Sequence, residues 1–188
     1  MTTEPIRDRK QLQQLAGYWL KRGNLRNYTM IVMGVCTALR ISDLLSLTWN
    51  DLYDNESGEF FSHIFVTERK TGKKQIIALN NQAIDALNLL FPIRKSIYVF
   101  SNNYSSPKPI SRIQAWRIVR VAAEAMGIAG RIACHSLRKT FGYHAWKSGT
   151  NPVVLMDIYN HSSYEMTRRY LGVSQDDRDK VYLNLTLF

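Results

Sequence analysis

The first residues that could do chemistry are a histidine and an arginine in the segment His135–Arg138. Residues three positions apart share one face of a helix, so the two side chains can converge on a single phosphate group. Taken alone, such a pair is more often an ordinary surface or core pair than part of an active site. Arg40 and His161, the latter nine residues before Tyr170, add further groups of the same chemical kind.

The charge balance indicates a polyanionic partner. The chain has 25 Lys and Arg against 15 Asp and Glu, a formal net charge of +10. Each phosphate that a cation neutralises releases condensed counterions, which favours nucleic acid. An anionic membrane surface is the weaker alternative, because no segment combines a basic face with the apolar face of an interfacial helix. Charge alone does not separate a protein that binds DNA from one that cuts it.

Length and composition predict one soluble, cytoplasmic globular domain. The chain has 188 residues, 45% of them hydrophobic, which is enough for one core. The longest apolar run, Met30–Leu39, is too short to span a bilayer. Cys36 and Cys134 are predicted to be free, buried thiols, and His63 and His144 have no partner at ligand-like spacing. We expect no disulfide, no metal and no cofactor.

The elements that must position the candidate residues are mostly helices. Asn24, Ser42 and Ser111 are predicted helix caps. A β-hairpin is expected over residues 60–67 and 75–79 with a basic turn at 69–74, and a short strand over 96–100. Helices are expected over residues 8–22, 25–39, 42–47, 81–91, 111–126, 135–147, 152–159 and 163–171, and from 175 onward. The fold class is mainly α with a small antiparallel β-sheet (α+β), in one domain over residues 1–188.

Three segments together resemble a known family. In Ala38–Leu47 an arginine follows Ala-Leu and precedes Ser-Asp and a leucine-rich stretch. The segment 135–170 contains His-x-x-Arg, a following Thr-Phe, then His-Ser-Ser and a tyrosine. Between them, Arg69–Lys73 is similar to a Lys-Thr turn. In order and spacing the chain resembles the catalytic domain of the tyrosine recombinase (phage integrase) family over nearly its whole length. The resemblance implies that family's fold and site-specific DNA recombination through a covalent 3′-phosphotyrosine.

The resemblance implies a role for each residue. Arg40 and Arg138 would stabilise the charge that builds up on the phosphate oxygens, because guanidinium groups are permanently charged and bind in a fork. Tyr170 would attack phosphorus and carry the DNA strand, so that no ATP is needed for rejoining. His135 is the candidate base that takes the phenol proton. Arginines would supply the electrostatics that magnesium supplies in other nucleases.

The resemblance also implies roles for three further residues. Lys70, in the hairpin turn, would be the general acid for the departing 5′ oxygen, although the neighbouring Lys73 and Lys74 could replace it. His161 would bind and orient the phosphate. Asp43 is expected to pair with an active-site arginine or histidine. Each candidate residue could instead have a purely structural role, such as a helix cap, a solvated charge in a turn or a core aromatic residue.

The chain departs from the family pattern at a few points. Tyr159-Asn160 stands where Leu-Gly usually precedes the second histidine, and Asn160 can adopt the left-handed backbone that glycine favours. Lys139 stands where a histidine is common. No N-terminal core-binding domain is expected, so the chain is either a fragment or a naturally short member that resembles fimbrial-switch invertases. We therefore expect weak, salt-sensitive binding to DNA.

The partner is expected to be double-stranded DNA. The helix over 111–126, with Arg112, Arg117 and Arg120, is a candidate DNA-facing surface, and Lys139 is a further candidate contact; a solvated helix face is an equal alternative. The apolar segment after residue 181 suggests exchange between protomers in a tetramer on DNA, with accessory DNA-bending proteins as possible partners. The task could be integration, excision or inversion, as in mobile genetic elements. Alternatives are relaxation of supercoils by a type IB topoisomerase-like enzyme and a catalytically inactive DNA-binding regulator.

Overall fold

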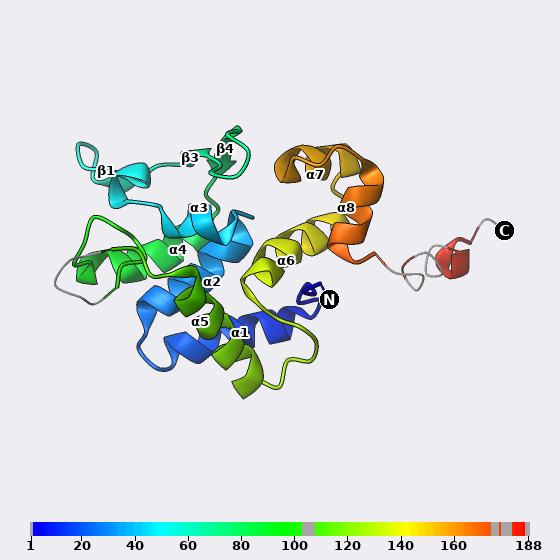
Figure 1. Ribbon diagram of the computed structural model, residues 1–188, viewed down its shortest axis with the longest axis horizontal. Helices are drawn as coiled ribbons and strands as arrows, with labels where there is room; N and C mark the ends of the chain where they lie inside the picture. Colours follow the sequence, from blue (N-terminus) through cyan, green and yellow to red (C-terminus); the bar gives the residue numbers. More distant parts are fainter. Residues whose placement is uncertain (1, 103–107, 174–176, 178–181, 187–188) are drawn as a thin grey trace. The chain divides into compact units, whose positions relative to one another are not determined.

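The computed structural model describes residues 2–102, 108–173, 177 and 182–186 (Figure 1). The chain divides into two compact units, Met1–Phe141 and Gly142–Phe188. Helix α6 (Cys134–Lys147) passes from the first unit into the second. A single catalytic domain over residues 1–188 stays a prediction. None of the helices in the described ranges is long and apolar enough to cross a membrane.

The first two helices begin after side-chain caps, of which Asn24 was predicted from the sequence and Asp8 was not. Helix α1 (Arg9–Leu20) begins after Asp8, whose carboxylate accepts hydrogen bonds from the first-turn amides. Helix α2 (Leu25–Cys36) begins after Asn24, which accepts from the amide of Asn27 at 3.1 Å. Side-chain oxygens at these positions satisfy amides that have no partner within the helix, which explains where both helices start.

The connection from α2 to α3 differs from the prediction. Helix α2 ends at Cys36 rather than Leu39, because Ala38 adopts a left-handed backbone (φ 54°) that no helix can continue through. Helix α3 (Ile41–Leu45) then begins with Arg40 at its N-cap, in extended conformation and without a side-chain cap bond. The predicted cap at Ser42 is therefore wrong. The turn at Ala38 places Arg40 at the head of α3 instead of in the body of a helix.

Two separate two-stranded ladders replace the single small sheet. Strands β1 (Tyr53–Asp54) and β2 (Glu59–Phe60) pair with each other, and β3 (His63–Thr67) pairs antiparallel with β4 (Lys74–Ala78). The predicted hairpin is confirmed, but its first strand is shorter because Phe60 pairs with Tyr53 instead. The expected strand over 96–100 is reduced to an isolated bridge between Thr48 and Tyr98.

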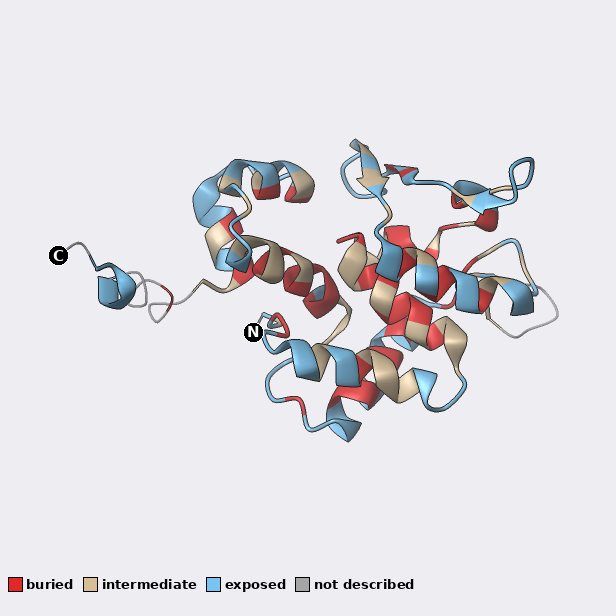
Figure 2. Cartoon of the chain, turned by 180° about the vertical axis from the view of Figure 1, so that it is seen from behind, coloured by how far each residue is buried: buried red, intermediate tan, exposed pale blue. Residues whose placement is uncertain are grey.

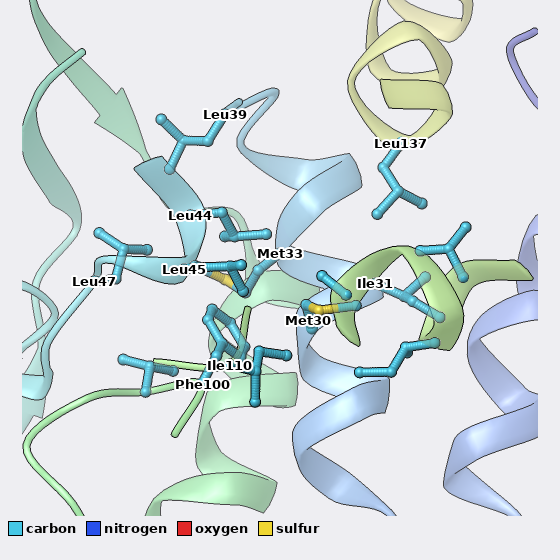
Figure 3. Packing of buried hydrophobic residues seen from close by; sticks show 14 of the residues in the cluster. Met30, Ile31, Met33, Leu39, Leu44, Leu45, Leu47, Phe100, Ile110 and Leu137 are labelled. Atoms are coloured by element: carbon cyan, nitrogen blue, oxygen red, sulfur yellow. The ribbon is translucent and has the colours of Figure 1, made fainter. Parts of the chain in front are cut away.

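The core of the first unit lies between the helices. Besides α1–α3 it contains the 3₁₀ turns η1 (Trp49–Asp51) and η2 (Phe91–Ile93) and the helices α4 (Asn81–Leu90) and α5 (Arg112–Ala125). The helices carry buried residues along one face and exposed residues along the other (Figure 2). Figure 3 shows Met30 of α2, Leu44 of α3 and Leu137 of α6 converging in one cluster of buried side chains. A Cβ at Gly34 would come within 2.8 Å of Leu137, so α6 is seated closely on α2.

The second unit consists of the rest of α6, helix α7 (Pro152–Tyr159) and helix α8 (Tyr164–Leu171). The caps of α7 and α8 are Asn151 and Ser163. Helix α7 ends at Asn160, which is left-handed (φ 55°, ψ 50°) as predicted. The helix expected from residue 175 onward falls mostly on residues outside the described ones. Both free cysteines are half-buried and lie in the first unit.

Candidate active site

Two of the predicted arginines meet at one carboxylate in the first unit. Arg40, at the head of α3, forms an ion pair with Glu68, which follows β3. Nη2 of Arg138, from α6, lies 4.0 Å from the same carboxylate oxygen, and its Nη1 donates a hydrogen bond to the carbonyl of Ala38. The Arg138 side chain is only 4% exposed, whereas that of Arg40 is 21% exposed. Residues almost a hundred positions apart in sequence are thus held as one cationic group.

The helix N-terminus of α6 supplies the histidine of the cluster. His135 occupies the first turn, and Arg138 lies one turn further along. Ser136 closes the start of the helix, because its hydroxyl accepts from the amide of Ala133 at 3.1 Å while its own amide donates to the carbonyl of Ala133 at 2.8 Å. Amides at a helix start and the helix dipole favour a bound anion. A phosphate at this place would therefore meet both the arginines and the helix start.

A cavity of about 480 Å³ opens beside these residues. His135 and Arg138 line it together with Arg112 and with apolar residues, among them Trp116 of α5. A larger cavity of about 600 Å³ elsewhere in the first unit shares no lining residue with it. Three of the predicted site residues, Arg112, His135 and Arg138, therefore line this one cavity.

Desolvation and the surrounding positive charges keep His135 neutral at pH 7. Desolvation and the positive charges of Lys139, Arg138, Arg40 and Lys70 lower the pKa of this imidazole to about 4. At neutral pH the imidazole therefore carries a lone pair that can accept a proton. Lys70 is the last of the positive charges that contribute to this lowered pKa.

The turn that carries Lys70 is tied down on both sides. The amide of Arg69 donates to Oδ1 of Asp43 at 3.2 Å, and the hydroxyl of Thr71 donates to Glu68. Lys70 itself is exposed between these two anchored neighbours. The hairpin turn is thus held against α3 by carboxylates rather than extending freely into solvent.

The expected pairing of Asp43 is wrong. Its carboxylate is 1% exposed and bonds to the main chain of Arg69 and, at 3.4 Å, to the hydroxyl of Ser42, not to an arginine or histidine side chain. The arginine partner is Glu68, which sequence reasoning missed. A signal for it does exist. The alternation of β3 buries Ile64 and Val66, and continuing it by one step places Glu68 on the same inward face.

The predicted DNA-contact residues fall into different environments. Arg112 and Arg117 are exposed on α5, and Arg120 pairs with Glu124 one turn along the same helix. Lys139 is 6% exposed and donates to the carbonyl of Thr3 at 2.8 Å, so it fixes the N-terminal segment and does not face solvent. A contact between Lys139 and DNA stays a prediction.

The second unit contains the other two predicted residues, packed against each other. The rings of His161 and Tyr170 meet edge to face with centroids 5.1 Å apart, and both contact Tyr159. Nδ1 of His161 shares a hydrogen bond with the hydroxyl of buried Thr167 at 3.0 Å. These contacts set the orientation of the imidazole, and they hold the phenol of Tyr170 next to it.

Comparisons with known proteins identify the class. The fold is that of a tyrosine recombinase catalytic domain: it matches the crystal structure of the XerH site-specific recombinase bound to palindromic difH substrate with a TM-score of 0.74, at 17% identity over 93% of this chain and 51% of that one. The model of the phage integrase family matches residues 7–176, and the chain belongs to this family. It is a site-specific recombinase of the tyrosine class.

Two curated relatives support the assignment. The probable integrase/recombinase YoeC of Bacillus subtilis (strain 168) is 37% identical over 95% of this chain and 94% of its own length. A tyrosine recombinase of Pseudothermotoga lettingae is 31% identical over 89% of this chain but only 56% of its own length. The chain thus spans nearly all of one relative and about half of the other.

Proposed function

We propose that this chain cleaves and rejoins DNA strands with Tyr170 as the nucleophile and a 3′-phosphotyrosine as the intermediate. The observation that carries the proposal is the pairing of Arg40 and Arg138 around one buried carboxylate, with His135 beside them at the mouth of a cavity. Two guanidinium groups can stabilise the charge that develops on a phosphodiester under attack.

The proposed step is a transesterification at phosphorus. The oxygen of Tyr170 forms a bond to phosphorus while the bond to the 5′ oxygen of the next nucleotide breaks. The phenol proton passes to His135, which is neutral at pH 7 because its pKa is about 4. Lys70 gives a proton to the departing 5′ oxygen. Attack by a 5′ hydroxyl of the partner strand reverses these steps and seals the new junction.

His161 is proposed to orient the phosphate. The hydrogen bond between Nδ1 and Thr167 fixes the ring, and we assign the other ring nitrogen to a phosphate oxygen. The contact of His161 with Tyr170 means that one packing arrangement serves both groups. A fixed ring beside the nucleophile loses little conformational entropy when the phosphate arrives.

Double-stranded DNA is the proposed substrate, and strand exchange between two sites is proposed to involve a tetramer. Tyr182, Leu183 and Leu185 are exposed by 61–83%, and an apolar segment of this kind could bind a neighbouring protomer. Accessory DNA-bending proteins stay an expectation from the family resemblance. Because its proposed substrate is DNA, we also propose that the protein acts in the cytoplasm.

The experiment is a search for a covalent DNA adduct. A pool of nicked duplexes with randomised sequence is incubated with the protein, because loss of the short strand beyond the nick traps the intermediate. We expect a denaturant-resistant adduct whose DNA-linked peptide contains Tyr170, and we expect Tyr170→Phe to abolish it. Tyr164→Phe, on the exposed side of the same helix, is the matched control and should retain the adduct. An adduct that survives Tyr170→Phe, or no adduct from DNA that the protein binds, would contradict the proposal.

A further inference from the structure

The side chain of Glu68 is buried between the two arginines, with 1% of its surface exposed. Its Oε1 forms the ion pair with Arg40, lies 4.0 Å from Nη2 of Arg138 and accepts from Nε2 of Gln75 at 3.2 Å. Its Oε2 accepts from the hydroxyl of Thr71. Both oxygens are therefore occupied, and one carboxylate connects α3, α6 and the β3–β4 turn.

The main chain of Glu68 closes the same turn. Its amide donates to the carbonyl of Lys73 at 2.9 Å, and its carbonyl accepts from the amide of Gly72 at 2.8 Å. Lys70 lies inside the loop that these bonds close. The position of the lysine relative to the arginines is thus defined by one residue, through its backbone on one side and its carboxylate on the other.

An acid at this place opposes the attraction of DNA. A negative charge next to the two guanidinium groups lowers the positive potential that a phosphate would experience. Burying a carboxylate also costs free energy, which only well-formed ion pairs and hydrogen bonds offset. The ion pairs with Arg40 and Arg138 and the hydrogen bond from Thr71 offset this cost and hold the pKa of Glu68 below its ordinary value, whereas DNA affinity does not explain why an acid stands there. What it does provide is a fixed geometry for three cationic side chains before any substrate is bound.

We propose that Glu68 is a positioning residue for strand cleavage, which holds Arg40, Arg138 and the Lys70 loop in the arrangement that the scissile phosphate requires. The inference deepens the proposed function and rests on it. Without the carboxylate the guanidinium groups repel each other and the loop loses an anchor. Both effects misplace charges that must act on one phosphate, and a displacement of about 1 Å can cost about a hundredfold in rate.

The test separates the rate of cleavage from the affinity for DNA. Glu68→Gln keeps the size of the side chain and removes its charge. The substrate is the set of nicked duplexes on which the parent protein forms the covalent adduct. On these duplexes we expect Glu68→Gln to form the adduct about 10- to 100-fold more slowly than the parent protein. The affinity for a duplex of random sequence should stay equal or become tighter, because one negative charge is lost. A residue that merely supports the fold would weaken binding and cleavage together.

Two further variants keep the test decisive if Glu68→Gln folds poorly. Thr71→Val removes one hydrogen bond to the carboxylate and leaves every charge in place, so we expect a smaller loss of rate with unchanged melting temperature. Glu59→Gln removes an equal charge from an exposed position on β2 and should leave the rate unchanged. The guanidinium N–H protons of Arg40 and Arg138, observed by NMR, should exchange faster with water in Glu68→Gln but not in Glu59→Gln.

The outcomes distinguish this inference from the proposed function. Cleavage by Glu68→Gln at the parental rate, or an equal loss in Glu59→Gln, overturns the positioning role while leaving Tyr170 as the nucleophile. An adduct that does not depend on Tyr170 overturns the proposed function instead. A parallel fall of affinity, rate and melting temperature in both Glu68→Gln and Thr71→Val would assign Glu68 to the fold alone.

Discussion

His135 lies among positive charges, and this makes its protonation state sensitive to the folding of the chain. Desolvation comes first among the causes of its lowered pKa, followed by Lys139, Arg138, Arg40 and Lys70. In the unfolded chain an imidazole titrates near its ordinary value of about 6.5. The folded protein holds the ring neutral down to a pH of about 4, so folding and proton binding are coupled through this residue.

The coupling predicts how stability depends on pH. Between pH of about 6.5 and 4 the unfolded chain binds the proton that the folded one refuses, so the free energy of unfolding should fall as the pH is lowered through this window. Above the window His135 should contribute no dependence. His135→Gln should remove this component, measured as the difference in urea midpoints between pH 7.5 and 5. His63→Gln, at an exposed strand position, is the control, and equal pH dependence in the parent and His135→Gln would refute the coupling.

Site residues could be predicted where they lie close together in the sequence. They could not be predicted where the interaction partner lies far away in the sequence on another element. The pair His135 and Arg138 shares a helix, so its spacing alone indicates a common face. Glu68 acts on Arg40 across 28 positions of sequence, and no local pattern links the two. Asp43, close to Arg40 in sequence, was the natural candidate for that partner, yet its carboxylate bonds to the hairpin backbone instead. Ion pairing between elements depends on how they pack, which the sequence pattern does not contain.

Among the elements, α6 has a close contact that depends on the absence of a side chain. A Cβ at Gly142 would come within 2.2 Å of the hydroxyl of Tyr159 and 2.5 Å of Leu171. Tyr159 in turn stacks on His161 and contacts Tyr170. The approach of α7 and α8 to Gly142 therefore underlies the packing of the proposed nucleophile and its neighbouring histidine.

Gly142→Ala should consequently displace Tyr159 and disturb both rings that pack on it. We expect a loss of about 1–3 kcal/mol in the free energy of unfolding, the usual cost of overpacking, and a slower formation of the Tyr170 adduct. Urea denaturation and adduct kinetics measure the two effects. Gly17→Ala is the matched control, because nothing lies within 4 Å of its Cβ position in α1, and it should be neutral or slightly stabilising. Unchanged stability of Gly142→Ala would show that the helices can separate without cost.

The starts of α2 and α5 were predictable from the sequence, whereas the start of α3 and the irregular connection before it were not. Side-chain caps at Asn24 and Ser111 mark the starts of α2 and α5 where the pattern places them, because capping is a local interaction. The left-handed turn at Ala38 has no such marker, since alanine rarely adopts this conformation. Tertiary contacts hold it: its carbonyl accepts from Arg138, which lies a hundred positions away. The departure from local preference thus occurs at the site itself.

At the scale of the whole molecule, the excess of basic residues governs association with DNA. A formal net charge of +10 makes attraction to a polyanion long-ranged and dependent on salt. Within that excess the cations are not equivalent. Arg138 and Lys139 are buried and bonded to carbonyl groups, whereas Arg112 is exposed and lines the cavity beside the site. Only exposed cations near the bound DNA should release counterions.

The affinity for a duplex of random sequence should therefore fall steeply as the salt concentration rises. The slope of log affinity against log salt is proportional to the number of phosphate contacts. We expect Arg112→Ala to reduce the slope of log affinity against log salt by about one and to weaken binding to all sequences alike. Arg22→Ala, at an exposed position lining the other cavity, removes the same charge and should leave the slope unchanged. Fluorescence anisotropy at several salt concentrations gives both slopes. A flat salt response in the parent would contradict the electrostatic account, and equal slope changes in the two variants would show that net charge acts without regard to position.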